Sequence, residues 1–345
     1  MSGHSEPQDQ LPPQAQIFAM INQMWTTRAT AAIAKLGVPD VLAAGPKSAR
    51  EIAQMLQLNE AALFRLLRAG SVFGILRHDT AANTFELTDL GHVLRSDSPN
   101  SLRNYLLTAV SPSHWRPWGQ VEQAVQTGLP PTLSELGCDI FTYFQRNPKE
   151  AEDFANAMSH LSSLSIEPTL DVLPLDKSEV VVDVGGSHGV LLGSILGRWK
   201  HLRGVLLEVP EVIQTAPAVL EPFGLGDRIE LVAGDFFKDI PAGDTYILKH
   251  ILHDWSDDEC IQILSNVYKA MAPGGRIFVL EILVDTSSKA SATNSVCMDL
   301  NMLVLTTGRE RTLEEYGCLF SKTGLHLRQA HKTASLITVI EGYKD

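Results

Sequence analysis

The sequence predicts an α/β protein in which a doubly wound parallel sheet follows a helical N-terminal half with a winged-helix pattern. From about residue 176 onward, short apolar runs alternate with helical patterns, as in a parallel sheet with crossover helices. One of these runs, residues 180–184, ends in a glycine-rich turn over residues 185–189. The chain before this point is mostly helical by periodicity. We therefore expect two domains, residues 11–165 and residues 166–345.

The N-terminal half begins with an apolar stripe at helical spacing. Its members recur three and four positions apart: Ile17, Met20, Ile21, Met24 and Trp25. A second helix is expected over residues 29–36, where it ends at Gly37. Ser48 and Glu51 have the spacing of a capping box at the start of the next helix. A further helix is expected over residues 60–69.

Two short strands are expected next, over residues 74–77 and 84–88, and they complete a helix, turn, helix and wing pattern. A winged helix suggests DNA binding. Residues 1–165, however, carry 12 Lys and Arg against 15 Asp and Glu, and the last helix offers only Arg65 and Arg68 as cations. A DNA-binding module needs a basic face with several phosphate contacts. We interpret this half as a dimerisation and substrate-lid domain, with a DNA-binding regulator as the weaker alternative.

Composition restricts the partners. Over 345 residues the chain has 28 Lys and Arg against 40 Asp and Glu, a net charge of −12, which disfavours nucleic acid and anionic membranes. No apolar run reaches the ~18 residues of a membrane span, and we find no signal-peptide core. The 4 cysteines are scattered without a CxxC pair, which favours reduced thiols in a cytoplasmic protein. We expect no metal site.

The C-terminal half has the pattern of a doubly wound sheet. The expected strands span residues 180–184, 204–208, 229–233, 245–249 and 276–280, followed by a terminal pair near 325–333 and 334–341. Helices are expected between the first five strands. In such a sheet the ligand lies beyond the carboxyl ends of the strands, near the point where the strand order reverses.

The glycine-rich turn indicates the kind of ligand. Its glycines do not match the dinucleotide pattern G-x-G-x-x-G, because position 187 is serine and position 190 is valine. The turn instead follows the order acid, x, Gly, x, small, x, Gly, beginning at Asp183 with Gly185 and Gly186. This resembles the first motif of class I S-adenosylmethionine (SAM) methyltransferases. An ordinary glycine-rich turn between a strand and a helix is the alternative.

Residues at the ends of the next strands complete a nucleoside-type site. Glu208 ends the second apolar run, where an acid hydrogen-bonds ribose hydroxyls in doubly wound folds. Gly234, Asp235 and Phe236 follow the third strand and offer an acceptor beside a flat apolar face, as an adenine pocket needs. Lys249 closes the fourth strand, where it can bind the cofactor carboxylate or a backbone carbonyl, or extend to solvent.

A base candidate follows the fourth strand. His253, next to Asp254, lies where a doubly wound fold places its chemistry, and a neutral imidazole can take a proton from a phenol. Methyl transfer from a sulfonium needs alignment and one base, without a covalent intermediate. Either Glu281, at the end of the fifth strand, or Glu310 can orient the imidazole. His250 is the rival base, and we expect it to pack beside the site.

Taken together, these motifs make residues 15–343 resemble the small-molecule O-methyltransferases that include the caffeic acid and acetylserotonin enzymes. The resemblance implies that His253 is the general base, flanked by Glu281 and Glu310. It implies that SAM, converted to S-adenosylhomocysteine, is held by eight residues: Asp183, Gly185, Gly186, Glu208, Gly234, Asp235, Phe236 and Lys249.

The same resemblance implies an intertwined homodimer in which the N-terminal helix of one subunit lines the substrate pocket of the other. Met24 and Trp25 are the candidates on that helix. The remaining substrate candidates are Phe154, Met158, His250, Asp254 and Asn301.

Two positions depart from the family pattern. Ser187 stands where the third loop glycine is usual, and a turn accepts serine there if its φ stays negative. Glu208 replaces the commoner Asp and should still reach a ribose. We predict a cytoplasmic homodimer that methylates a hydroxyl of a small aromatic or polyketide-like molecule, without nucleic acid or membrane partners. N- or C-methylation, or SAM binding without methylation, is the alternative within this fold.

Overall fold

The computed structural model describes residues 11–98, 101–284 and 289–345. The chain forms two compact units, Met1–Ser111 and Pro112–Asp345. This division falls earlier in the chain than residue 165, because helix α11 (Pro148–Leu170) packs against helix α12 (Val190–Arg198) of the second unit. Periodicity alone does not tell on which core a helix packs. A division of function at residue 165 stays a prediction.

The first unit has the winged-helix pattern expected from the sequence. Its elements are α1 (Pro13–Lys35), α2 (Val38–Leu42), α3 (Ala49–Leu56), α4 (Glu60–Val72), β1 (Leu76–Asp79), β2 (Thr84–Leu87), α5 (Asp89–His92) and α6 (Arg103–Ala109). Ser48 and Glu51 form both bonds of the predicted capping box. The expectation of a separate helix over residues 29–36 is wrong, because α1 continues without a break to Lys35. Apolar periodicity does not change there, so no sequence signal ends the first helix before Gly37.

The second unit is built around a seven-stranded sheet. Helices α7 (Pro112–Trp118), α8 (Val121–Thr127), α9 (Thr132–Glu135), α10 (Ile140–Arg146) and α11 precede it. Then follow β3 (Val180–Val184), α12, β4 (Arg203–Glu208), α13 (Pro210–Ile213), α14 (Ala216–Leu220), β5 (Ile229–Ala233), β6 (Gly243–Lys249), α15 (Asp257–Ala270), β7 (Met271–Glu281), α16 (Lys289–Leu305), α17 (Leu313–Thr323), β8 (His326–Lys332) and β9 (Thr338–Tyr343).

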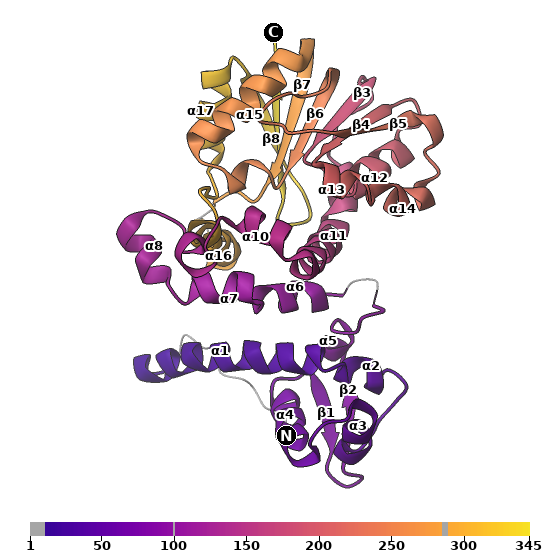
Figure 1. Cartoon of the computed structure of the whole chain (residues 1–345), viewed down its shortest axis with the longest axis vertical. Coiled ribbons are helices and arrows are strands. Elements are labelled where there is room, and N and C mark those ends of the chain that lie inside the picture. Colours follow the sequence, from indigo (N-terminus) through magenta and orange to yellow (C-terminus); the bar gives the residue numbers. More distant parts are fainter. Residues whose placement is uncertain (1–10, 99–100, 285–288) are drawn as a thin grey trace. The chain divides into compact units, whose positions relative to one another are not determined.

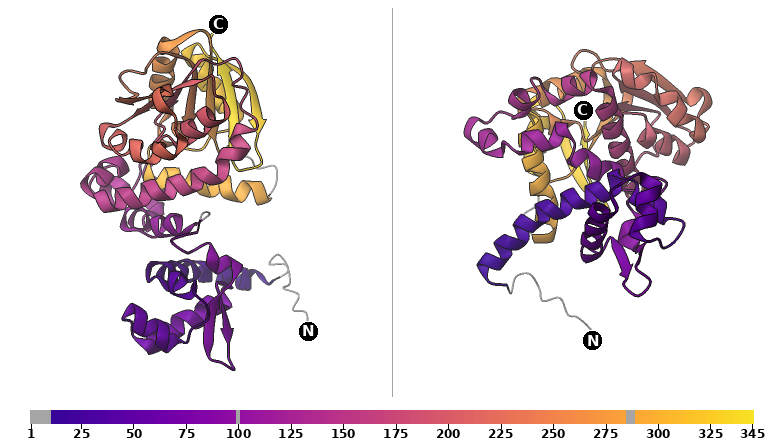
Figure 2. Two further views of the ribbon diagram at one scale, coloured as in Figure 1. Left: turned by 90° about the vertical axis from the view of Figure 1, so that its right-hand side faces the viewer. Right: turned by 60° about the horizontal axis from the view of Figure 1, so that its bottom comes forward.

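The strand order is β5-β4-β3-β6-β7-β9-β8, with β3 to β7 parallel and β9 antiparallel to β7. Figure 1 shows α15 and α17 on one side of this sheet and α12 to α14 on the other, and the views in Figure 2 show yellow β8 and β9 at one edge. The doubly wound sheet and its terminal hairpin are therefore as predicted. The expectation of a helix between every pair of the first five strands is wrong between β5 and β6, where residues 234–242 form a turn and loop.

Alternating side chains divide the core between the two faces of the sheet. Val181 of β3 and Ile247 of β6 join the cluster under α12. Val182 and Tyr246, their neighbours along the strands, join the cluster under α15 and α17. Because strand side chains alternate with a period of two, a parallel strand covered on both faces must be apolar at nearly every position. This explains why these strands appear in the sequence as continuous apolar runs.

The parallel register brings the functional strand ends to one edge. Val184 of β3 lies beside Leu207 of β4, and Lys249 of β6 lies beside Leu280 of β7. The order reverses between β3 and β6, and at this point the carboxyl ends of a doubly wound sheet form a crevice. Within the described ranges, no helix combines the length and the apolar character that a bilayer crossing requires.

The sheet core makes a first prediction. Phe278 of β7 is 0% exposed, so Phe278→Ala should lower the free energy of unfolding by about 3–5 kcal/mol. Val125→Ala on α8, at 71% exposure, is the control and should change it by less than about 0.5 kcal/mol. Urea titration of both variants measures the difference. Equal, small effects would mean that Phe278 is not in the core.

Candidate active site

The glycine-rich turn leaves β3 in a strained conformation. Gly185 and Gly189 have φ of 68° and 78°, and Ser187 has φ of 53°. The condition of a negative φ at Ser187 is therefore not met. The left-handed backbone costs a non-glycine residue roughly 1–2 kcal/mol. In this conformation the Ser187 N–H donates to Oε2 of Glu208 at 3.0 Å. This hydrogen bond connects the strained turn to the end of β4.

Two glycines of the turn are required by close packing. A Cβ at Gly186 would lie 2.4 Å from Oδ2 of Asp183, and a Cβ at Gly185 would lie 2.6 Å from Cδ1 of Ile251. The turn is thus held between the end of β3 and the segment that follows β6. A side chain at either position would force these neighbouring side chains to shift, and the φ of 68° at Gly185 also favours glycine.

Two carboxylates line the turn. Asp183 is buried, and its burial raises its pKa to about 7, against the lowering effect of Lys249. Among the described residues no hydrogen-bond partner reaches its Oδ2. Burial also raises the pKa of Glu208, while bonds from the N–H groups of Val209 (2.8 Å) and Ser187 oppose that rise. Glu208 is fixed at the strand end, as the sequence analysis placed it.

Lys249, at the end of β6, points into the protein. Its Nζ donates to Oγ of Ser162 on α11 at 2.7 Å, so the alternative that it extends to solvent is wrong. Burial lowers its pKa to about 8, although the charges of Asp183 and Glu281 oppose the shift. Sequence reasoning missed Ser162, because nothing in a lone serine on a long helix indicates a partner 87 residues away.

The turn after β5 carries the predicted adenine candidates. Oδ1 of Asp235 accepts from the backbone N–H of Phe237 at 2.9 Å, and its Oδ2 lies 3.1 Å from Nζ of Lys238. The ring of Phe236 meets Trp255 edge to face at a centroid distance of 6.1 Å. Gly234 begins this turn, and its N–H donates to the carbonyl of Glu208 at 3.0 Å. The turn is therefore tied to the end of β4.

His253 lies in a short 3-10 helix, η4 (Leu252–Asp254), directly after β6. Its Nδ1 is 2.9 Å from Oε1 of Glu310, which makes Glu310 the hydrogen-bond partner of the ring. Glu281 is fully buried, and its Oε1 accepts from the backbone N–H groups of residues 251, 252 and 253 at 3.1, 3.0 and 3.4 Å. Its Oε2 is 3.6 Å from Nδ1 of His253. Glu310 and Glu281, the two alternatives from the sequence, thus both contact His253. Glu310 contacts the ring, and Glu281 contacts chiefly the backbone.

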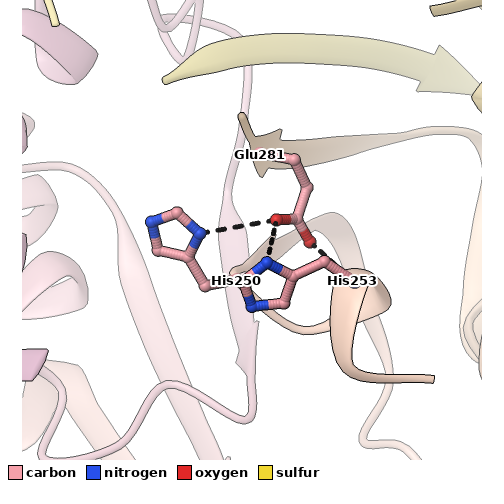
Figure 3. A group of neighbouring side chains, drawn as sticks. All are labelled: His250, His253 and Glu281. Atoms are coloured by element: carbon pink, nitrogen blue, oxygen red, sulfur yellow. Dashed lines mark hydrogen bonds and ion pairs between the residues drawn. The ribbon is translucent and has the colours of Figure 1, made fainter. Parts of the chain in front are cut away.

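His250 lies beside His253 and Glu281, as Figure 3 shows. Its φ is 53°, its ring stacks on that of His253 at 5.2 Å, and its Nδ1 is 3.4 Å from Oε2 of Glu281. Burial and the charge of Lys249 lower its pKa to about 4, so the ring is neutral. Both imidazoles and Glu281 bring ligand-type atoms within 4.8 Å of one another. Since Nδ1 of His253 is already hydrogen-bonded to Glu310, we assign no ion to this group.

The electrostatics at His253 favour its charged form. Burial lowers the pKa of the imidazole, but the carboxylates of Glu281, Asp254 and Glu310 outweigh burial and raise it to about 10. Asp254 lies on the other side of the ring, with Oδ1 at 3.7 Å from Nε2, and burial raises its pKa to about 6. A proton on this ring is therefore stabilised by three acids.

The remaining substrate candidates lie on different elements. On α11, Phe154 stacks on Phe144 at a centroid distance of 4.8 Å, and Met158 is half-buried. On α16, Oδ1 of Asn301 accepts from Nε1 of Trp118 at 2.8 Å. Met24 and Trp25 belong to the first unit, where both are exposed on α1.

Comparisons with known proteins agree with this geometry. Residues 118–326 match an O-methyltransferase domain and residues 18–97 match an O-methyltransferase dimerisation domain. A mitomycin biosynthesis 6-O-methyltransferase of Streptomyces lavendulae is 34% identical over 310 residues, covering 89% of this chain and 87% of that protein. The phenazine O-methyltransferase PhzM of Lysobacter antibioticus is 33% identical, covering 94% of each chain. The structure of human N-acetylserotonin methyltransferase with SAM superposes with a TM-score of 0.88 at 29% identity, covering 99% of each chain.

The sheet, its glycine-rich turn and the acid at the end of β4 define a class I, SAM-dependent methyltransferase. The chain belongs to the O-methyltransferase family and is a SAM-dependent O-methyltransferase. The residues present fit this cofactor. The turn leaves no space for side chains at Gly185 and Gly186, and a buried carboxylate oxygen of Asp183 faces Gly186 without a described partner.

The turn makes a second prediction. In Gly186→Ala the new Cβ would collide with the Asp183 carboxylate, so the dissociation constant for SAM should rise at least about tenfold. Gly197→Ala is the matched control, because its Cβ would meet no described atom within 4 Å on helix α12. Calorimetric titration with SAM measures both. Equal affinities for the two variants would mean that the packing at Gly186 does not shape the SAM site.

Proposed function

We propose that this enzyme methylates a hydroxyl group of a small aromatic or polyketide-like molecule, with His253 as the general base. The observation that carries the proposal is the bond between Nδ1 of His253 and Glu310, which leaves Nε2 as the reacting nitrogen. The relatives named above support the substrate class, because one is named for mitomycin biosynthesis and the other for a phenazine. Bound SAM supplies an electrophilic methyl group on a sulfonium.

The basicity of His253 suits a phenol. An imidazole whose pKa is raised to about 10 matches a phenolic hydroxyl, whose ordinary pKa is also ~10. Proton transfer between such groups is close to balanced in energy, but near pH 7 only the small neutral fraction of the imidazole can accept the proton. After transfer, Glu310 and Asp254 stabilise the imidazolium. Glu281 positions the backbone of residues 251–253, so that the ring stays in place.

The SAM-holding roles follow from the strand ends. We assign the ribose hydroxyls to Glu208 and the adenine to Asp235 and Phe236, because these side chains follow adjacent strands β4 and β5 at the same edge. Lys249 holds the end of β6 against α11 near Asp183. Lys249 would offer a cation to a carboxylate of the cofactor.

The first unit supports a homodimer. Its match to a dimerisation domain coincides with an exposed apolar stripe on α1, formed by Ile17, Phe18, Met20, Ile21, Met24 and Trp25. Large exposed apolar patches mark association surfaces. We propose that α1 packs on a second copy of the chain and that Met24 and Trp25 line the partner's substrate pocket. The four free cysteines favour a cytoplasmic location, and the acidic charge disfavours a nucleic acid partner.

The base role makes a third prediction. His253→Ala should bind SAM with unchanged affinity and lose about 10²–10⁴-fold in kcat, because general base catalysis contributes this much. Mass spectrometry of a panel of phenols and aromatic amines incubated with labelled SAM identifies the acceptor and measures the rate. His326→Ala, on β8 with a half-exposed ring, is the control. Wild-type turnover in His253→Ala would overturn the base role, and methylation of amines alone would overturn O-methylation.

The pH profile makes a fourth prediction. The groups that face His253 are Glu281, Glu310, Asp254 and His250. Since only the neutral imidazole is a base, kcat/KM should rise with pH toward about 10, instead of levelling off above the ordinary ~6.5. In Glu310→Gln the acidic partner is lost, the pKa of His253 falls, and this limb should move to lower pH. An unchanged limb in Glu310→Gln would contradict the assignment of the titrating group to His253.

A further inference from the structure

We propose that Gly308, Arg311 and Asp257 form a clasp that holds the segment carrying Glu310 against the segment carrying His253, and that Arg311 is a positioning residue for catalysis. The inference rests on the proposed base role of His253. It concerns the backbone around this residue, which the mechanism above takes as given.

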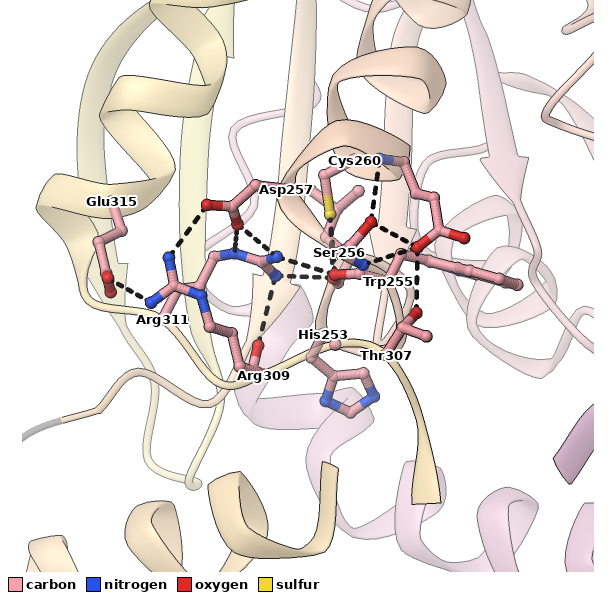
Figure 4. Close-up of polar contacts among 12 residues, drawn as sticks. His253, Trp255, Ser256, Asp257, Cys260, Thr307, Arg309, Arg311 and Glu315 are labelled. Carbon is pink, nitrogen blue, oxygen red and sulfur yellow. Dashed lines mark hydrogen bonds and ion pairs between the residues drawn. The ribbon is translucent and has the colours of Figure 1, made fainter. Parts of the chain in front are cut away.

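Arg311 binds the main chain on both sides of His253, as Figure 4 shows. Its guanidinium is 0% exposed and donates to the carbonyl of Leu252 and to the carbonyl of Trp255, each at 2.8 Å. Its Nε and Nη2 also donate to Oδ1 of Asp257, at 3.0 and 2.8 Å, and its Nη1 donates to the carbonyl of Arg309 at 3.3 Å. The guanidinium thus spans helix η4, the turn on which His253 lies.

The geometry requires arginine. A guanidinium presents five N–H donors in a planar, rigid fork, whereas the lysine ammonium is a compact point charge on a flexible chain. Lysine at position 311 cannot reach both carbonyls and the carboxylate of Asp257 in one conformation. A buried charge is also costly unless it is fully bonded. The carboxylate of Asp257 and three backbone carbonyls supply that bonding here.

Gly308 brings the two backbones into direct contact. A Cβ at this residue would lie 2.0 Å from the carbonyl oxygen of His253 and 2.5 Å from the backbone N of Trp255. Gly308 is therefore required for close approach between the segments. Glu310 lies between Gly308 and Arg311 in the sequence, and its own N–H donates to Oδ1 of Asp299 at 3.0 Å. Contacts at Gly308, Glu310 and Arg311 thus fix the position of the Glu310 carboxylate relative to the imidazole of His253.

The neighbouring Arg309 provides the contrast. It also pairs with Asp257, at 3.1 Å, and with Glu315, but its side chain is 44% exposed. An exposed ion pair of this kind contributes little. Arg309 and Arg311 therefore share a segment and a partner, while only the side chain of Arg311 reaches the backbone around His253.

The experiment compares Arg311→Lys and Gly308→Ala with the control Arg309→Lys. We expect kcat to fall about 10–100-fold in the first two, since a misplacement near 1 Å costs about this much, with KM for SAM within about twofold of wild type. Arg309→Lys should retain kcat within about twofold. Arg311→Lys keeps the positive charge but no longer holds the Glu310 segment in place. Glu310 then raises the pKa of His253 less, so the rising limb of kcat/KM should move to lower pH. A merely structural role would leave that limb unchanged.

If Arg311→Lys and Gly308→Ala do not fold, Asp257→Asn decides, because its carboxylate is partly exposed and the amide keeps the side-chain shape. It should lower kcat and move the limb in the same direction. The clasp is overturned if the folded variants match Arg309→Lys, or if kcat falls without a change of the pH profile. His253→Ala, measured beside them, separates this result from failure of the base role, because it tests the base without touching the clasp.

Discussion

The buried carboxylate of Glu281 is the constraint on which the site depends. A carboxylate at 0% exposure must be bonded, and one of its oxygens accepts three successive backbone N–H groups after β6. Those N–H groups converge because His250 adopts a left-handed φ of 53° immediately before them. The parallel register of β6 and β7 places the acid beside this turn. The sheet thus fixes the position of His253, the proposed base, through its backbone.

The two acids around His253 have different tasks. Glu281 is anchored at a strand end and cannot move without breaking three hydrogen bonds. Glu310 comes from an irregular segment and reaches the ring itself at 2.9 Å. Their summed charge, with that of Asp254, raises the pKa of the imidazole to about 10 despite burial. At physiological pH the imidazole is therefore mostly protonated, and the proposed base step uses its minor neutral form.

Much of the sheet and its strand ends could be predicted from the sequence, because doubly covered strands are continuously apolar and a polar residue at their ends stands out. Asp183, Glu208 and Glu281 lie where this argument placed them. The left-handed Ser187 could not be predicted, since its strain is linked to a bond with a residue on another strand. The bond from Lys249 to α11 was missed for the same reason.

Helix α11 contacts the end of β6 and also carries two of the proposed substrate residues. The helix carries Ser162, which bonds the lysine at the end of β6, and also Phe154 and Met158. Strand ends carry the proposed base and the proposed SAM-binding groups, and their positions follow from the sheet. Helix side chains can change without altering that register. Differences in acceptor among related enzymes can therefore arise on α11 and α16 while the base and the SAM turn keep their geometry.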